Sequence, residues 1–221
     1  MKTSESGKGE LEKRQQYIEH LSHEIMTPLA IIKSKAELLL QSPALREEDL
    51  LNTAAIIETV DRLTSINKGL ILLSKIHQGI YIDREQISVV PLIQKMIQML
   101  NPIAESKNIQ IEITSELSLT IETNKTLFEI LILNTLKNAL IHNIQDGTLK
   151  IWISNDGISF ENTGLIGKKE IKELFKRFVS GAASPDSIGL GLSIMKQICE
   201  QLDYQLDYKR SGHIHRLNIT F

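Results

Sequence analysis

The stretch HLSHEIMTP, residues 20–28, decides how the first third of the chain is read. Apolar residues recur around it at three- and four-residue steps, which is the period of an amphipathic helix packed against other helices. The members of this row are Leu11, Ile18, Leu21, Ile25, Leu29, Ile32, Ala36 and Leu39. On this phase His23 lies opposite the row and points to solvent, with Thr27 one turn away on the same face. Pro28 has no N–H, so the Glu24 carbonyl loses its helical partner and we expect a kink there.

Three interpretations of His23 are open at this point. One is an ordinary surface histidine on a helix. The second is a zinc site, because His-Glu opens the pattern H-E-x-x-H, but that pattern needs a second histidine where Thr27 stands. The third is a phosphoacceptor, because residues 22–29 (SHEIMTPL) resemble the H-box of sensor histidine kinases of the HisKA family, S-H-E-x-x-T-P-L. The resemblance implies that His23 accepts phosphate, that Glu24 orients its ring and that Thr27 serves dephosphorylation.

Composition sets limits on the class of protein. The chain has 221 residues, 42% hydrophobic and 24% charged, with a net charge of −2. These values are typical of globular protein and give no reason to expect nucleic acid as a partner. Cys199 is the only cysteine, so an internal disulfide is excluded. No apolar run approaches the ~20 residues of a membrane span. We therefore expect a cytoplasmic chain, with any sensor and inner-membrane anchor lying outside it.

The first part of the chain predicts a helical hairpin. Residues 1–9 are polar and are expected to be a disordered start or junction. Two helices are expected, at about Glu10–Gln41 and Asp49–His77, joined by a short connection that contains Pro43. They form an antiparallel hairpin, and residues 10–78 make the first domain. One hairpin gives each apolar row only one partner, so we expect a homodimer with a four-helix bundle.

The rest of the chain predicts a mixed α and β domain at residues 91–221, after a linker at 79–90. Helices are expected at residues 91–107, 124–142, 169–179 and 190–202. Strands are expected at 108–116, 117–122, 148–154, 204–209 and 214–221. A helical segment followed by an α+β layer indicates two domains.

Three polar residues share one face of the helix at 124–142. Asn134, Asn138 and His142 follow one another at four-residue steps, which a solvated face would explain equally well. The segment also resembles the N-box of GHKL ATP-binding domains, N-x-x-x-N-A-x-x-H/Y. The resemblance implies that Asn138 holds Mg²⁺, for which a carboxamide oxygen is a suitable ligand. It also implies that Asn134 and His142 contact phosphates or nucleotide. Related ATPases carry a water-activating Glu where Asn134 stands, and its absence favours phosphoryl transfer over hydrolysis.

A glycine-containing segment opens the last predicted helix. An ordinary loop would explain it, but glycines at a helix start also let the backbone approach a phosphate, which the free N–H groups there favour. Residues 187–194 (SIGLGLSI) resemble the G2 box, G-x-G-L-G-L, with serine in place of the first glycine. The resemblance assigns Gly189, Gly191 and Leu192 to nucleotide binding. Upstream, residues 175–178 (FKRF) resemble the F-box, which adds Arg177 and makes residues 179–188 an ATP lid.

The adenine-binding G1 box, D-x-G-x-G, is compared with residues 155–159 (NDGIS), which follow a predicted strand. In this register Asn155 replaces the adenine-binding Asp, Gly157 keeps its place and Ser159 replaces the second glycine. A carboxamide can accept from the adenine amino group and donate to a ring nitrogen, as it does when it reads adenine in DNA. Only one strand is predicted before this segment, where the family has a hairpin of two.

The five resemblances occur in the family's order, and the chain is identified as a member of the sensor histidine kinases. The implied fold is a helical-hairpin dimerisation and phosphotransfer domain followed by an α/β-sandwich GHKL ATP-binding domain. The implied activity passes the γ-phosphoryl of Mg·ATP to His23 and then to an aspartate of a response regulator, with phosphatase activity as well.

Two alternatives stay open. One is a dimeric phosphotransfer and docking module whose altered G1 box no longer binds ATP. The other is a GHKL serine kinase or ATPase in which His23 is incidental.

Overall fold

The structure is a computed structural model that describes residues 2–42, 45–77, 81, 83–115, 119–166, 171–175 and 190–221. The chain separates into two units, Met1–Gln78 and Gly79–Phe221. No helix in the described ranges combines the length and the apolarity that a membrane crossing requires.

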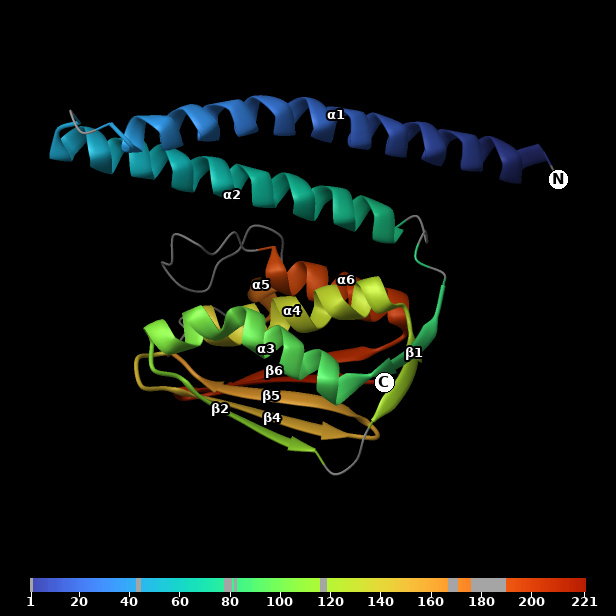
Figure 1. The fold of residues 1–221 in the computed structure, drawn as a ribbon. Helices are drawn as coiled ribbons and strands as arrows, with labels where there is room; N and C mark the ends of the chain where they lie inside the picture. Colours follow the sequence, from blue (N-terminus) through green and yellow to red (C-terminus); the bar gives the residue numbers. More distant parts are fainter. Residues whose placement is uncertain are drawn as a thin grey trace. The chain divides into compact units, whose positions relative to one another are not determined.

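Two long helices, α1 (Lys2–Leu40) and α2 (Glu47–His77), pack along each other as the first unit (Figure 1). Between them lies a buried seam formed by Leu29, Ala36, Val60, Leu73 and Ile76. Helix α1 continues through Pro28 and begins at Lys2, whereas the sequence predicted a disordered segment over residues 1–9. Residues 2–9 contain no proline, so the backbone bonds of an established helix can extend to its first residues.

The predicted apolar rows of the hairpin divide between two faces. One part forms the seam, and the other part is 38–53% exposed on the single chain. The exposed members are Leu21, Ile25, Ile32 and Leu39 on α1 and Ile56, Leu63 and Leu70 on α2. An apolar stripe at three- and four-residue spacing is wider than one neighbouring helix can cover, so the hairpin leaves a second apolar face open.

A five-stranded sheet forms the base of the second unit (Figure 1). Its strand order is β2-β4-β5-β7-β6, with β2 and β4 parallel and the other pairs antiparallel. The strands are β2 (Gln110–Ser115), β4 (Thr148–Ser154), β5 (Gly157–Thr163), β6 (Gln205–Ser211) and β7 (Ile214–Thr220). A separate pair is formed by β1 (Glu85–Ser88) and β3 (Thr120–Thr123).

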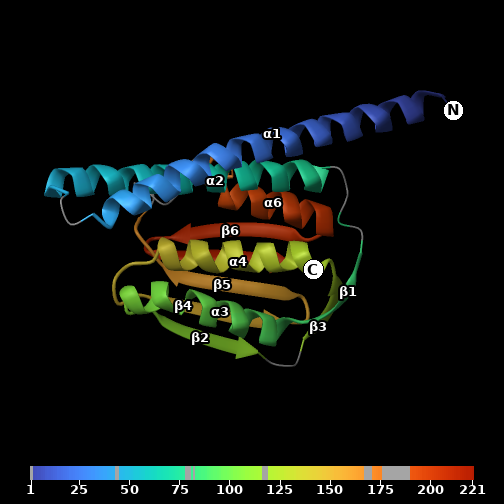
Figure 2. The same ribbon diagram turned by 45° about the horizontal axis from the view of Figure 1, so that its top comes forward.

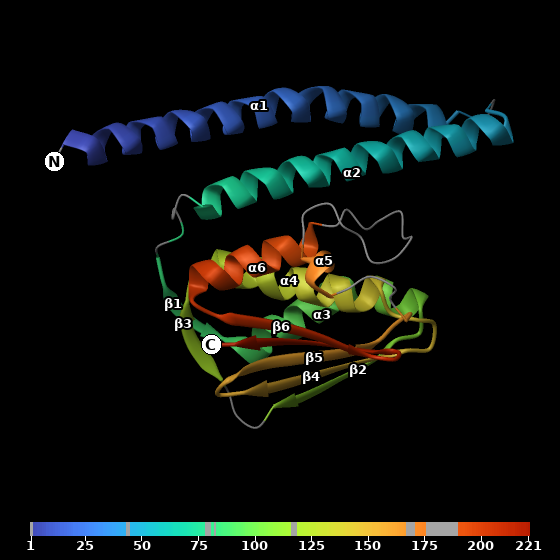
Figure 3. The same ribbon diagram turned by 180° about the vertical axis from the view of Figure 1, so that it is seen from behind.

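Helices α3 (Val89–Ser106), α4 (Lys125–Ile141) and α6 (Gly191–Leu202) lie on one face of this sheet (Figures 2 and 3). A short helix, α5 (Ile171–Leu174), follows β5. Alternate residues of the central strands are buried on the helix side, among them Leu149, Ile151 and Phe160. Helix α4 carries fully buried side chains around much of its circumference because α3, α6 and the sheet all contact it.

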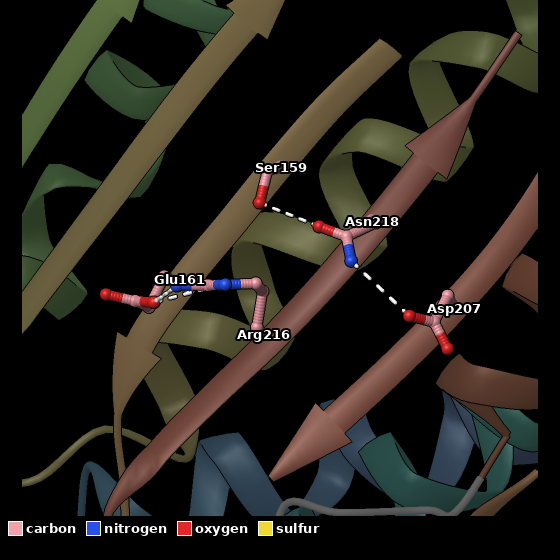
Figure 4. A network of polar contacts seen from close by, with 5 residues as sticks. All are labelled: Ser159, Glu161, Asp207, Arg216 and Asn218. Carbon is pink, nitrogen blue, oxygen red and sulfur yellow. Dashed lines mark hydrogen bonds and ion pairs between the residues drawn. The ribbon is translucent and has the colours of Figure 1, made fainter. Parts of the chain in front are cut away.

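The opposite face of the sheet carries a polar network (Figure 4). Ser159 Oγ donates to Asn218 Oδ1 at 2.8 Å, and the Asn218 amide donates to Asp207 at 3.5 Å. Arg216 pairs with Glu161 across β5 and β7. Cross-strand polar pairs of this kind suit a solvated sheet face.

Two elements were absent from the sequence prediction. The expected linker at 79–90 contains β1, whose four residues pair with β3, and α3 begins at Val89. Strand β5 lies where a single nucleotide-binding loop was expected. The segments expected to be strands at 148–154 and helix at 190–202 correspond to β4 and α6.

Candidate active site

His23 is exposed on α1, as its helical phase predicted, and so are Glu24 and Thr27. Thr27 Oγ1 donates to the His23 carbonyl at 3.1 Å. A threonine that bonds back to the preceding turn adds a second donor to a carbonyl of the helix and favours bending there. Pro28 removes the next backbone donor. The histidine thus precedes a locally weakened turn.

The polar face of α4 meets the start of α6. Asn134, Asn138 and His142 are all half-buried. The Asn134 amide donates to the Ile130 carbonyl at 2.8 Å, which leaves its Oδ1 directed elsewhere. A β-carbon at Gly191, the first residue of α6, would lie 3.9 Å from this oxygen. The two motifs, far apart in the sequence, are therefore neighbours.

The N-terminus of α6 has no side-chain cap. Leu190 occupies the N-cap position and offers no polar side chain, and Ser193 Oγ donates to the Leu190 carbonyl at 2.8 Å instead. The first N–H groups of this twelve-residue helix, at Gly191 and Leu192, receive no side-chain acceptor from the N-cap. A helix start in this condition favours an anion.

The structure does not bring Asn155 and Gly157 together with the predicted site residues of α4. Ser154 pairs with Gly157, so residues 155–156 are the two-residue loop of the β4–β5 hairpin, and both are exposed. This loop lies near the start of α4, because Phe221 N–H donates to the Asp156 carbonyl and the Phe221 ring packs 6.2 Å from that of Phe128. The motif residues of α4 lie toward its other end. The sequence prediction missed β5, which returns the chain to that end.

The end of β5 lies close to the end of α4 that carries His142. Asn162 is 8% exposed and continues the buried row of Ile158 and Phe160. Two residues later, a β-carbon at Gly164 would lie 3.0 Å from the His215 ring and 3.1 Å from the His142 carbonyl oxygen. Asn162-Thr163-Gly164 thus fits the D-x-G portion of the G1 box, with Asn for Asp. The sequence signal for this segment is a polar residue, Asn162, in a row of alternating apolar residues, followed two positions later by Gly164.

A compact network joins the end of α4 to the end of β5. Thr163 Oγ1 donates to Asn143 Oδ1 at 2.5 Å and accepts from the Thr148 N–H at 2.9 Å. The Asn143 amide donates to the Thr148 carbonyl at 3.0 Å. Gly147 lies against this network, where a β-carbon would overlap Asn143 Oδ1 and Thr163 Oγ1. The network fixes the two chain segments that carry His142 and Asn162.

Lys107 caps the C-terminus of α4. Its Nζ donates to the carbonyls of Ile141 at 2.5 Å, Asn143 at 3.1 Å and Leu140 at 3.4 Å. An ammonium there satisfies carbonyls without helical partners and opposes the helix dipole. Burial, then the charges of Lys107 and His215, lower the pKa of His142 below its ordinary value.

Two histidines, His213 in the turn before β7 and His215 of β7, hold the segment after β5. His215 Nε2 contacts the Leu165 carbonyl at 3.0 Å, and its Nδ1 contacts the Tyr208 hydroxyl at 2.9 Å. Since a carbonyl only accepts, the proton is on Nε2, and the neutral ring accepts from Tyr208. His213 Nδ1 contacts the Gly164 carbonyl at 3.0 Å. Burial lowers the pKa of His215 more than any other cause.

Two predicted residues, Arg177 and Gly189, lie outside the described residues, as does the expected lid at 179–188. Phe175 is half-buried and packs edge-on to Tyr208 at 6.5 Å, so this part of the F-box contacts the sheet. Among the described residues, no three His, Cys, Asp or Glu side chains gather as a metal site.

Comparison with known proteins agrees with this division of the chain. The family model of the His Kinase A (phospho-acceptor) domain matches residues 13–79. The model of the histidine kinase-, DNA gyrase B- and HSP90-like ATPase matches residues 123–219. Sensor histidine kinase YkoH of Bacillus subtilis is 28% identical over 206 residues, which are 90% of this chain and 45% of that protein.

Solved structures share the fold. Full-length ShkA in complex with AMPPNP matches with a TM-score of 0.71 at 20% identity, over 93% of this chain and 45% of that one. Histidine kinase AdeS of Acinetobacter baumannii matches with a TM-score of 0.63 at 18% identity, over 90% and 96%. The chain spans less than half the length of the first curated relatives it matches. The two family models together cover more than half of the chain, which belongs to the sensor histidine kinases and carries the phosphoacceptor and ATPase-like domains of that family's catalytic core.

Proposed function

We propose that this chain autophosphorylates on His23 with ATP and passes the phosphoryl group to an aspartate of a response regulator. The observation that carries the proposal is the meeting of α4 and α6. Asn134 presents its carboxamide oxygen toward Gly191, at a helix start whose N-cap residue has no polar side chain. Backbone N–H groups and a carboxamide arranged in this way suit the phosphates of a nucleotide.

The second half of the nucleotide site is the end of β5. Asn162 offers its carboxamide oxygen to the amino group of adenine, and Gly164 lets the chain after β5 pack closely against the His215 ring and the His142 carbonyl. Asn138, on the same face of α4 as Asn134, would hold Mg²⁺ through its carboxamide oxygen. Bound Mg²⁺ neutralises charge on phosphate oxygens during phosphoryl transfer.

The chemistry at His23 is a displacement at phosphorus. The lone pair of a neutral ring nitrogen forms the N–P bond, the bond from the γ-phosphorus to the bridging oxygen of ADP breaks, and the ring loses the proton from its other nitrogen. Glu24, the next residue and also exposed, supplies a carboxylate that accepts this ring N–H and favours the developing positive charge.

A homodimer completes the first unit. The exposed residues of α1 and α2 recur every seven positions, at 25, 32 and 39 and at 56, 63 and 70. Such a repeat is typical of a helical bundle seam. A second copy of the hairpin would cover this face.

Radiolabelled ATP tests the phosphoacceptor. His23→Gln should abolish labelling, while His20→Gln, a matched change three residues earlier, should leave it intact. The label should be acid-labile, as phosphohistidine is. Acid-stable label, or label retained in His23→Gln, would favour the serine kinase alternative, and release of labelled phosphate without label on the protein would favour the ATPase.

A fluorescent ATP analogue tests whether the base binds at Asn162 or at Asn155. Asn162→Ala should weaken binding roughly tenfold or more, because a buried polar anchor is lost. Asn155→Ala should change it less than twofold. The opposite ranking would restore the register that puts adenine at Asn155, and no binding by the unmodified protein would favour a docking module.

Dephosphorylation of the regulator involves Thr27, whose hydroxyl lies one turn from His23 and donates to the His23 carbonyl. Thr27→Ala should keep autophosphorylation and lose phosphatase activity toward the phosphorylated regulator. Equal loss of both activities would mean that the substitution disturbs the helix near Pro28.

A further inference from the structure

A buried amide of α2 holds the peptide that precedes His23. Asn67 lies in the seam of the hairpin and is 7% exposed. Its Nδ2 donates to the Ser22 carbonyl of α1 at 3.0 Å, and Ser22 is 4% exposed. This bond crosses between two helices whose seam also holds apolar residues such as Leu29 and Leu73.

The carbonyl that Asn67 holds belongs to the peptide group joining Ser22 to His23. Fixing this peptide plane limits rotation at the His23 α-carbon and so limits the direction in which its side chain leaves the helix. The bond acts on the buried side of α1, and the imidazole stands on the exposed side.

The bond lies next to a weak point in the backbone ladder of α1. Thr27 Oγ1 competes for the His23 carbonyl, and Pro28 offers no N–H to the Glu24 carbonyl. Immediately beyond, Leu29 packs into the seam. The hydrogen bond from Asn67 therefore holds the segment before the weak point against α2, and the packing of Leu29 in the seam holds the segment after it.

Stability alone gives no reason for an amide at this position. Burying a carboxamide costs free energy that its hydrogen bond offsets only in part, and an apolar side chain would fill the seam without that cost. In helical bundles, a buried Asn fixes how two helices are aligned at the expense of stability.

We propose that Asn67 is a positioning residue for phosphoryl transfer, which sets the orientation of His23 by holding the Ser22 carbonyl. The proposal rests on the proposed role of His23 as phosphoacceptor. Asn67 does not contact the reacting atoms and acts through the peptide bond of its neighbour.

The test compares Asn67→Leu with Thr53→Val in the full chain. Thr53 is a suitable control because it is 6% exposed on α2 but donates within its own helix, to the Asp49 carbonyl at 2.6 Å. Asn67→Leu should lower kcat of autophosphorylation about tenfold, because a small misplacement of a reacting group is costly. KM for ATP should stay within twofold and the melting temperature should not fall. Asn67→Gln, which keeps a donor, should recover part of the rate.

Amide hydrogen exchange gives a readout that does not need activity. In Asn67→Leu, the backbone N–H groups of residues 23–27 should exchange about fivefold faster, since local opening becomes easier. Thr53→Val should leave both kcat and exchange unchanged. The proposal is overturned if Asn67→Leu matches the unmodified protein in both measurements, or if Thr53→Val produces the same losses. If the unmodified protein takes no label on His23, the proposed function fails; Asn67 then has no role in transfer, whatever exchange shows.

Discussion

Replacing Lys107 with methionine removes a charge that three backbone carbonyls share while keeping most of the methylene packing. The Leu140 carbonyl also accepts from Asn143 N–H at 3.2 Å, so the loss falls on the carbonyls of Ile141 and Asn143. Hydrogen bonds from a charged donor contribute about 1.5–3 kcal/mol, and the helix dipole adds a few tenths to 1 kcal/mol. The half-exposed position favours the lower part of this range, so the expected loss is about 2–3 kcal/mol.

The second unit can be followed by itself in this experiment. Trp152, the single tryptophan, lies on β4, so its fluorescence during urea unfolding reports on the sheet and not on the hairpin. Lys95→Met, at an exposed position of helix α3, whose C-cap residue is Lys107, is the matched control and should change stability by less than about 0.5 kcal/mol. In thermal unfolding, Lys107→Met should lower the melting temperature of this unit by about 8–12 °C. Equal, small losses in Lys107→Met and Lys95→Met would show that the three carbonyls gain nothing from the ammonium.

Two further predictions concern the same region. The pKa values of His142 and His215 are both lowered, chiefly by burial, so at acid pH the unfolded chain binds more protons than the folded chain. The contribution of these two histidines to the free energy of unfolding should therefore be fully present above about pH 6.5 and should be lost as the pH falls toward their folded-state pKa values. Urea titrations at pH 7 and 5 should show this fall, and a variant with glutamine at both positions should flatten it; unchanged pH dependence would contradict the assignment. Gly147→Ala should cost about 2–3 kcal/mol because its β-carbon would overlap Asn143 Oδ1. Gly212→Ala has open space but a φ of +59° and should cost about 1 kcal/mol, and a reversed order in urea unfolding would refute this.

Local periodicity predicted most elements because their signals are local. The buried alternation of β4 and the amphipathic helix α6 are visible in short windows of sequence. Strand β1 was missed because four residues are too few to show a period, and its partner β3 lies more than thirty residues away. The contact of Lys107 with the end of α4 is likewise long-range, and no pattern in either segment indicates it.

The sequence prediction places the base site at Asn155 for a local reason. Asn155-Asp156-Gly157 between two alternating apolar runs is a hairpin-turn signal, but it also resembles part of a glycine-rich nucleotide loop. The hairpin interpretation explains the structure, because Ser154 pairs with Gly157. The hairpin interpretation also predicts a second strand, β5, and makes Asn162 at the end of that strand a candidate for the base site.

The proposed role of Asn162 gives a reason for a buried polar residue at this end of the sheet. Its Nδ2 donates to the Thr163 carbonyl at 2.6 Å, which leaves Oδ1 as the acceptor available to a ligand. An apolar residue would continue the row of Ile158 and Phe160 at lower cost in desolvation. A carboxylate would bring an oxygen against the Thr163 carbonyl. The amide of Asn162 therefore suits this backbone and also presents an acceptor to an amino group. The same physical explanation thus covers why this residue is polar in an apolar row and why it is Asn where the family has Asp.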